Sequence, residues 1–132
     1  MFKNSPFYAG FAVDDIEKAK AFYGKTLGVG VIETEMGLLM IHAPNGYSVL
    51  VYPKEKHTPA EHTILNFPVD DIDASVDRLH KAGVKFEHYD MGMIKTDAKG
   101  IMRPGPDRPA GAPAGQAWFK DPAGNILSLI ED

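Results

Sequence analysis

The chain has 132 residues, of which 44% are hydrophobic and 24% charged. This composition is typical of one globular domain with a real core, and it excludes a disordered chain. A formal net charge of −4 without a basic stripe argues against a nucleic-acid partner. The lack of cysteine excludes disulfides, thiolate metal ligands and cysteine nucleophiles.

No segment approaches the roughly 20 apolar residues that a membrane span needs. The first twenty residues also lack an apolar run that ends in a cleavage-like site, so they do not resemble a signal peptide. We therefore expect a cytoplasmic protein with no membrane partner.

The first predicted element is a strand at residues 7–13, where apolar residues alternate with small or polar ones. Asp14 and Asp15 follow, a helix N-cap signal that the helix dipole favours. Apolar residues then recur at helical spacing, and Gly28 ends the helix. Three strand candidates come next: VGVIETEM, GLLMIHA and YSVLVYP, the last two joined by the turn PNG.

The chain then repeats itself. YAGFAVDDIEKAKAFY (8–23) matches ILNFPVDDIDASVDRL (64–79) at a constant offset. The identical pairs are Phe11/Phe67, Val13/Val69, Asp14/Asp70, Asp15/Asp71 and Ile16/Ile72. The second copy also runs through a helical pattern to a glycine, Gly83. Two copies of one supersecondary unit are therefore indicated, and we interpret both Asp pairs as helix caps rather than catalysts.

The second unit continues with VKFEHYD and then with AWFKD and NILSLIE, joined by the turn DPAGN. Residues 95–116 lie between them and are rich in Pro and Gly, so we expect a long loop without regular structure. The prediction is an α+β fold in one domain, residues 1–132. It consists of two βαβββ modules, approximately 5–54 and 61–132, with two four-stranded sheets and the helices on the outer faces.

Three segments carry a family resemblance: FAVDDIEKAKAFYGKTLGV, FPVDDIDASVDRLHKAGV and above all WFKDPAGNILSLIE. The chain resembles the vicinal oxygen chelate superfamily, which includes glyoxalase I, extradiol dioxygenases, and fosfomycin and bleomycin resistance proteins. The resemblance covers essentially the whole chain. It implies a mixed sheet shaped like a cup, but it does not imply one reaction, because the family hosts many.

The same resemblance implies where a metal would sit. In the family's enzymes each module supplies a His or Gln from its first strand and a Glu from its last. Those positions here are Tyr8, Leu50, Ile64 and Ser128. Leucine and isoleucine have no donor atom, and a neutral hydroxyl is a poor ligand for a hard divalent cation. We therefore expect neither a metal nor another cofactor, and metal-dependent catalysis is disfavoured.

A relocated metal is the alternative, with His62 as its candidate ligand. His62 precedes Ile64 by two residues and should share its face of the strand. The stretch HTPAEH (57–62) is no metalloprotease motif, because Pro59 breaks any helix that would align its histidines.

By strand alternation, the cup should be largely apolar, with a few hydroxyl, imidazole and amide groups. This chemistry is typical of a small-molecule site. The facing of Trp118 stays open at this point. The candidate ligand-binding residues are Tyr8, Leu50, Tyr52, His62, Ile64, Asn66, Trp118 and Ser128. The aromatic members could equally be core residues that fill the cup.

Our first interpretation is a metal-free protein that binds a small, partly aromatic organic molecule, as the bleomycin resistance proteins do. The resemblance also implies a homodimer. Alternatives are a lyase, isomerase or dioxygenase with a relocated metal or with metal-free acid–base chemistry by His62 and Tyr8, and a non-catalytic interaction module. A further hypothesis makes IMRPGPDRPAG (101–111), within the long loop, a lid over the cup, with Arg103 or Arg108 available for an anionic group.

Overall fold

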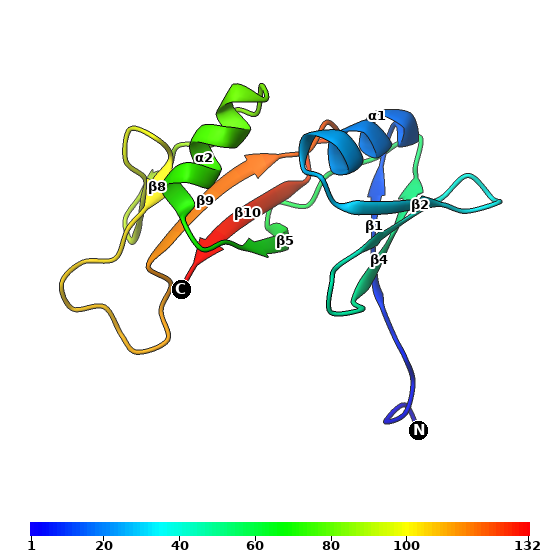
Figure 1. Cartoon of the computed structure of the whole chain (residues 1–132), viewed down its shortest axis with the longest axis horizontal. Coiled ribbons are helices and arrows are strands. Elements are labelled where there is room, and N and C mark those ends of the chain that lie inside the picture. The colour runs from blue at the N-terminus through cyan, green and yellow to red at the C-terminus, as the bar shows by residue number, and fades with distance from the viewer. The chain divides into compact units, whose positions relative to one another are not determined.

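The computed structural model describes residues 1–132, and the chain divides into two compact units, Met1–Pro59 and Ala60–Asp132 (Figure 1). The elements of the first unit are β1 (Ala9–Val13), α1 (Ile16–Ala21), η1 (Phe22–Thr26), β2 (Gly30–Glu33), β3 (Leu39–His42) and β4 (Ser48–Pro53). Those of the second are β5 (Thr63–Pro68), α2 (Ile72–Lys81), β6 (Asp90–Met91), β7 (Ile94–Lys95), β8 (Ile101–Met102), β9 (Gly115–Lys120) and β10 (Ile126–Glu131). The predicted α+β class with two four-stranded sheets is confirmed.

The sheet of the first unit has the strand order β1-β4-β3-β2, with β1 parallel to β4 and the other pairs antiparallel. One face is buried, and every second residue of its strands belongs to it, as the pleat requires. Its buried members are Phe11, Val13, Leu39, Ile41, Val49 and Val51. The opposite face, which carries Leu50 and Tyr52, is less buried.

The two Asp pairs cap the helices, as predicted. The Asp15 carboxylate accepts hydrogen bonds from the backbone N–H groups of Glu17 and Lys18, both at 3.1 Å. The Asp71 carboxylate accepts one from Ala74 N at 3.0 Å. Each carboxylate satisfies N–H groups that have no partner inside the first helical turn.

The first helix differs from the prediction in its second half. Regular α-helix ends at Ala21, and a π-helical turn follows in which the Leu27 N–H donates to Phe22 O at 2.9 Å. The wider turn carries Tyr23, which is fully buried, with its ring centroid 5.8 Å from that of Phe11 on β1. Gly28 ends the helix with φ at +70°, the left-handed conformation that glycine adopts without strain.

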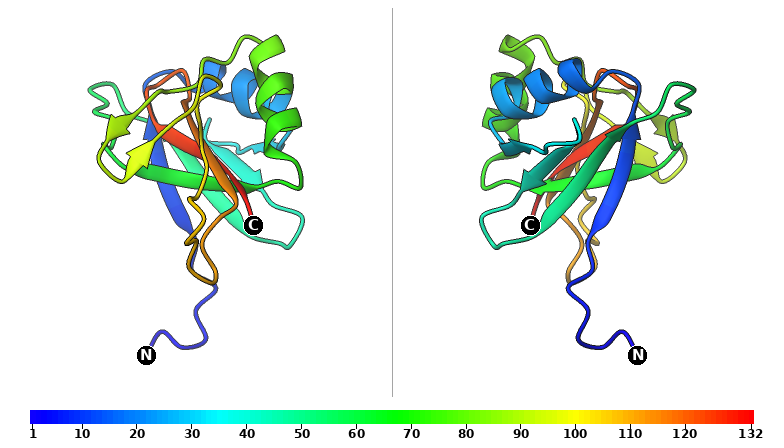
Figure 2. Two further views of the ribbon diagram at one scale, coloured as in Figure 1. Left: turned by 90° about the vertical axis from the view of Figure 1, so that its left-hand side faces the viewer. Right: turned by 90° about the vertical axis from the view of Figure 1, so that its right-hand side faces the viewer.

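The second unit repeats the plan with the order β5-β10-β9-β8, in which only β5 and β10 are parallel. α2 lies on one face of this sheet (Figures 1 and 2). The buried residues between helix and sheet are Ile72, Val76, Ala117, Phe119, Leu127 and Leu129.

The fourth strand of this second sheet is not the segment predicted. The backbone of residues 84–90 is linked to that of β9 only by an isolated bridge between Phe86 and Phe119 and by one hydrogen bond from the Glu87 N–H to Trp118 O, at 2.8 Å. The strand beside β9 is β8, inside the stretch expected to lack regular structure. The reason is a local turn, because the Asp97 carboxylate accepts from the N–H groups of Lys99 and Ile101, both at 2.9 Å. That turn delivers Ile101, 1% exposed, to the core.

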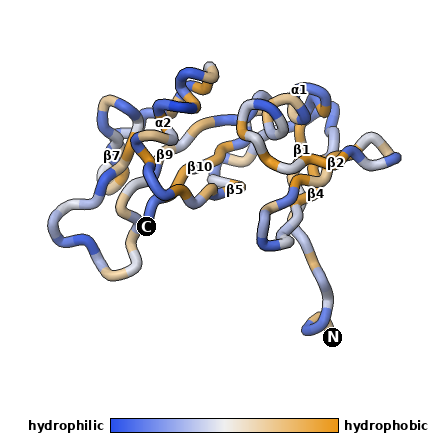
Figure 3. The backbone as a smooth tube through the Cα atoms, viewed as in Figure 1, coloured by the Kyte–Doolittle hydropathy of each residue, from blue (hydrophilic) through white to orange (hydrophobic).

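Both predicted hairpin turns are confirmed, and they share one geometry. Ala43 N donates to Tyr47 O at 2.8 Å, and Asp121 N donates to Asn125 O at 2.9 Å. The glycine in each, Gly46 or Gly124, has φ near +90° (87° and 89°). Hydrophobic residues are concentrated in the strands, whereas most turns are hydrophilic (Figure 3). None of the helices has the length and apolar character needed to cross a bilayer.

Candidate functional site

The candidate site lies on the face of the second sheet that points away from α2. Ser128, at the centre of β10, is paired with Asn66 on β5 and with Trp118 on β9. Residues directly opposite each other on neighbouring strands point to the same side of a sheet. The Trp118 ring therefore lies on the Ser128 face, which answers the question that its sequence context left open.

Ser128 bridges two side-chain amides. Its hydroxyl donates to Asn66 Oδ1 at 2.5 Å and accepts from Gln116 Nε2 at 3.4 Å. The serine is 0% exposed, whereas Asn66 is exposed and Gln116 is half-buried. A buried hydroxyl needs partners, and the two amides supply them. Asn66 Nδ2 and Gln116 Oε1 make no hydrogen bond in the structure, so one donor and one acceptor are left beside the serine.

An aromatic pair flanks this amide bridge. Trp118, 8% exposed, donates its Nε1–H to Thr63 Oγ1 at 3.2 Å. The Tyr89 ring meets the indole edge-on, with 5.5 Å between centroids. Burial, and next the nearby Glu87 carboxylate, raise the pKa of Tyr89 above its usual value, so its phenol stays neutral. The face thus combines uncharged hydrogen-bonding groups with an aromatic wall.

A β-bulge changes the pattern expected for β5. Ile126 pairs with Thr63 and Leu127 pairs with Leu65, so Ile64 is the extra residue. Strict alternation, which put His62, Ile64 and Asn66 on one face, is broken there. His62 precedes the strand and is exposed, and Thr63 is the residue whose hydroxyl reaches Trp118.

The other candidates from the sequence belong to the first unit. Tyr8 precedes β1 and is 57% exposed. Leu50 and Tyr52 lie on β4, opposite Gly10 and Ala12 of β1, on the face away from α1. Leu50 is half-buried, whereas Tyr52 is 41% exposed. Also on this face, the His42 Nδ1 and Ser48 Oγ atoms lie 2.9 Å apart across the β3–β4 hairpin.

The residues at the four family metal positions do not fit a divalent cation. Leu50 and Ile64 present only carbon, and the Ser128 hydroxyl is already committed to two neutral amides. Tyr8 lies outside the strand. No group of three or more His, Asp or Glu side chains is placed to hold a metal ion. The donor chemistry of these positions therefore disagrees with the metal chemistry of the family's enzymes.

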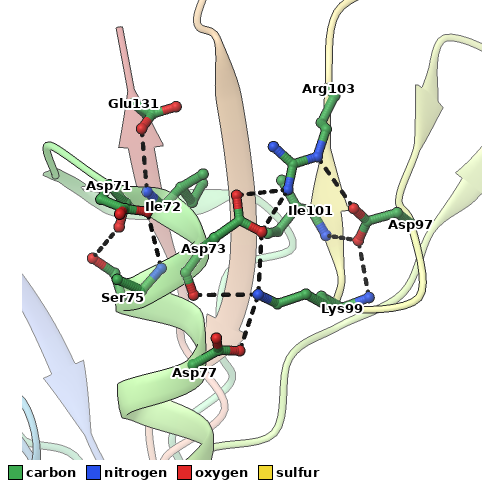
Figure 4. A network of polar contacts seen from close by, with 11 residues as sticks. Asp71, Ile72, Asp73, Ser75, Asp77, Asp97, Lys99, Ile101, Arg103 and Glu131 are labelled. Carbon is green, nitrogen blue, oxygen red and sulfur yellow. Dashed lines mark hydrogen bonds and ion pairs between the residues drawn. The ribbon is translucent and has the colours of Figure 1, made fainter.

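The 95–116 loop does not offer Arg103 to a ligand, so that hypothesis is wrong for this residue. Its Nη2 lies 2.8 Å and 2.9 Å from the two Asp73 oxygens on α2, and its Nε lies 3.3 Å from Asp97 Oδ2 (Figure 4). Because Asp73 lies on α2, the guanidinium ties the loop to that helix. Arg108 donates to Ala112 O at 2.8 Å within the loop.

Sequence reasoning missed three members of the site, Thr63, Tyr89 and Gln116. Gln116 precedes Trp118 by two residues on β9, so the strand period would have found it once the facing of the indole was known. Thr63 reaches the site only because of the bulge, and Tyr89 comes from irregular chain, so no periodic signal marks either residue.

Comparisons with known proteins agree with this architecture. A family model described as the Glyoxalase/Bleomycin resistance protein/Dioxygenase superfamily matches residues 6–129. Similar solved structures include TnmS3, an antibiotic binding protein from Streptomyces sp. CB03234, at 25% identity, covering 97% of each chain with a TM-score of 0.63. Lactoylglutathione lyase from Agrobacterium tumefaciens is 20% identical over 98% of this chain and 95% of its own, with a TM-score of 0.65.

The fosfomycin resistance protein FosX from Listeria monocytogenes is 14% identical over 98% of this chain and 93% of its own, with a TM-score of 0.67. No curated protein matches the chain. Because the family model spans nearly the whole sequence, the chain belongs to the Glyoxalase/Bleomycin resistance protein/Dioxygenase superfamily.

Proposed function

We propose that the protein binds a small, partly aromatic organic molecule, without a metal ion, at the Ser128 face of the second sheet. The observation that carries this proposal is the replacement of a metal-ligating carboxylate by a buried serine held between Asn66 and Gln116. Its support from the comparisons is coarser, namely an antibiotic binding protein and a fosfomycin resistance protein among the similar structures.

The binding chemistry follows from the groups left free at that face. The Asn66 amide N–H and the Gln116 carbonyl would fix the orientation of a polar group on the ligand. The edge of Trp118 and the Tyr89 ring would contact an aromatic or apolar part, with favourable offset or edge-on geometry. Sites of this kind are mostly apolar with a few placed polar groups.

We also propose that the protein acts as a homodimer, which rests on the family resemblance alone. Sedimentation velocity at micromolar concentration tests it, and a single species at the mass of one 14.4 kDa chain would contradict it. A cytoplasmic location and the lack of a nucleic-acid partner stay predictions from the sequence.

Trp118 makes the binding proposal directly testable, because it is the only tryptophan in the chain. Bleomycin and a set of fused-ring aromatic compounds are titrated while the intrinsic fluorescence is recorded. We expect at least one compound to change the emission saturably. Replacing both Asn66 and Gln116 by Ala should lower the affinity for that compound about tenfold, because two hydrogen bonds to the ligand are lost. Asn4→Ala, an exposed amide near the N-terminus, should leave its affinity unchanged.

Calorimetric titration with zinc, nickel, manganese and ferrous iron separates the alternatives, and we expect no binding. If a metal binds near-stoichiometrically and His62→Ala abolishes this binding, the proposal of a metal-free site is wrong. An enzyme with a relocated metal would then be favoured. If no aromatic compound changes the Trp118 emission and no metal binds, the interaction module replaces our proposal.

A further inference from the structure

A pocket lies in the second unit, on the side of the sheet that α2 covers. Its volume is about 410 Å³, within the range of small-molecule sites. The lining residues are Val76, Asp77, His80, Lys85, Phe86, His88, Ala98 and Lys99. None of them belongs to the Ser128 face.

The charges around this pocket are unbalanced in favour of cations. The Asp77 carboxylate is neutralised by Lys99, whose Nζ lies 3.0 Å from Asp77 Oδ1. The Lys85 ammonium group makes no ion pair, and neither the His80 nor the His88 imidazole makes a hydrogen bond in the structure. The chain as a whole carries a formal charge of −4, so an unpaired ammonium group beside two imidazoles stands out. A concave wall with one sign of charge attracts the opposite ion.

An apolar wall stands beside these groups. Phe86 is half-buried, and its ring tilts against the buried ring of Phe119, with 5.5 Å between centroids. Val76 of α2, 3% exposed, is the other large apolar group of the lining. An inorganic anion would use only the charged groups, whereas a ligand with a ring would use both walls.

The walls are held in place by defined contacts. A Cβ built on Gly100 would lie 3.0 Å from Phe86 Cβ and 3.1 Å from Glu87 O, so the turn before β8 packs tightly on residues 86–88. Lys99 and Arg103 bind that turn to Asp73 of α2 at 3.1 Å and 2.8 Å (Figure 4). The pocket is therefore formed before any ligand arrives, which lowers the entropic cost of binding.

We propose that this pocket binds a small organic anion with an aromatic body, the class represented by aryl carboxylates. The carboxylate would lie against Lys85 and the imidazoles, and the ring against Phe86 and Val76. This inference is independent of the proposed function, because it concerns different residues on the opposite side of the second sheet.

The test is an amide NMR titration of the full chain with sodium benzoate at constant ionic strength. We expect saturable shifts at residues 85–88 and 98–99. Benzyl alcohol, which lacks the charge, and acetate, which lacks the ring, should cause much smaller shifts. Changing Lys85 and His88 together to Ala should lower the affinity for benzoate about tenfold. Lys81 is the last residue of α2 and lies outside the pocket, so Lys81→Ala should leave the affinity for benzoate unchanged.

Equal shifts from acetate and benzoate would overturn the proposal, because they would show only attraction of anions to a charged surface. Unchanged benzoate affinity in the double variant would overturn it as well. Lys85→Gln keeps the test decisive if the double variant fails to fold, because Lys85 is exposed and holds no structural contact. The Lys85→Gln variant should still bind benzoate severalfold more weakly than wild type.

Discussion

Ser128 shows how one residue can decide which chemistry a fold supports. At a position where the family resemblance implies a metal-ligating carboxylate, this chain has a hydroxyl that both donates and accepts a hydrogen bond. The Ser128 hydroxyl uses both hydrogen bonds to hold the Asn66 and Gln116 amides in place. What remains available to a ligand belongs to the amides, not to the serine.

Substitutions at Ser128 should separate its structural role from any metal role. Ser128→Ala removes both hydrogen bonds but leaves half-exposed amides that water can reach, so we expect a loss of about 1 kcal/mol in the free energy of unfolding. Ser128→Glu introduces a carboxylate at a fully buried position without a cation, and should cost roughly 3 kcal/mol or more. Urea unfolding measures both.

Metal titration of Ser128→Glu completes this experiment. We expect no tight binding, because Leu50 and Ile64 would still offer no donor atom. A variant that gained both metal affinity and stability would contradict our account of the site.

At the scale of elements, the ion pairs between α2 and the β8 segment explain why a strand forms in a stretch rich in Pro and Gly. Asp73 forms ion pairs with Arg103 and Lys99. Asp97 forms an ion pair with Arg103 and accepts hydrogen bonds from two backbone N–H groups (Figure 4). Propensity alone argues against a strand here. Tertiary contacts to a neighbouring helix outweigh it.

This network makes stability depend on acid pH. The hydrogen bond from Arg103, and next that from Lys99, lower the pKa of Asp73 below its usual 3.8. A carboxyl with a lower pKa in the folded state stabilises the fold above its unfolded pKa, and this contribution is lost as the pH falls through the folded value. Asp73→Asn should therefore destabilise the protein at pH 7, and the difference from wild type should shrink below about pH 3.8.

Chemical unfolding at pH 7 and pH 3 measures this difference. Asp107→Asn, in the exposed 103–111 loop and without an ion pair, serves as the control, and its free energy of unfolding should match that of wild type at both pH values. A constant penalty for Asp73→Asn across the pH range would mean that the ion pairs contribute nothing.

The turn before β8 has a matched test of its own. Gly100 combines a φ of +86° with crowding by Phe86, whereas Gly105, five residues later, would meet nothing within 4 Å. We expect Gly100→Ala to lower the free energy of unfolding by about 1–3 kcal/mol and Gly105→Ala to lower it far less. Equal effects in thermal unfolding would show that the packing of this turn on residues 86–88 is unimportant.

At the scale of the whole molecule, the two compact units are joined by a largely exposed connector between β4 and β5, residues 54–62. Limited trypsin digestion should cut first after Lys56 and yield fragments 1–56 and 57–132, because exposed connectors are nicked before packed elements. Arg103 and Arg108 each precede a proline, which protects the exposed 103–111 loop from trypsin. Lys56→Gln should slow the first cut, and earlier cleavage outside residues 54–62 would contradict the division.

Much of the fold could be predicted from the sequence, for reasons that are local. The repeated Val-Asp-Asp-Ile fixes a strand end and a capped helix, and the two Pro-x-Gly turns fix the hairpins. The bulge at Ile64 and strand β8 could not be predicted, because each depends on partners distant in the chain. Tyr89 was missed for the same reason. The shared facing of Asn66 and Ser128 could be predicted, because the strand period carries that information, whereas the facing of Trp118 follows only from the register between β9 and β10.

The uncharged character of the Ser128 face has a consequence for the conditions under which it would work. Thr63, Asn66, Gln116, Trp118 and Ser128 carry no proton that leaves or arrives near neutral pH, and Tyr89 titrates above its usual range. An uncharged ligand held there would bind with an affinity that changes little with pH near neutrality or with salt. The pocket beside Lys85 depends on charge and would respond to both. One unit would then carry two recognition surfaces, one constant and one tuned by its environment.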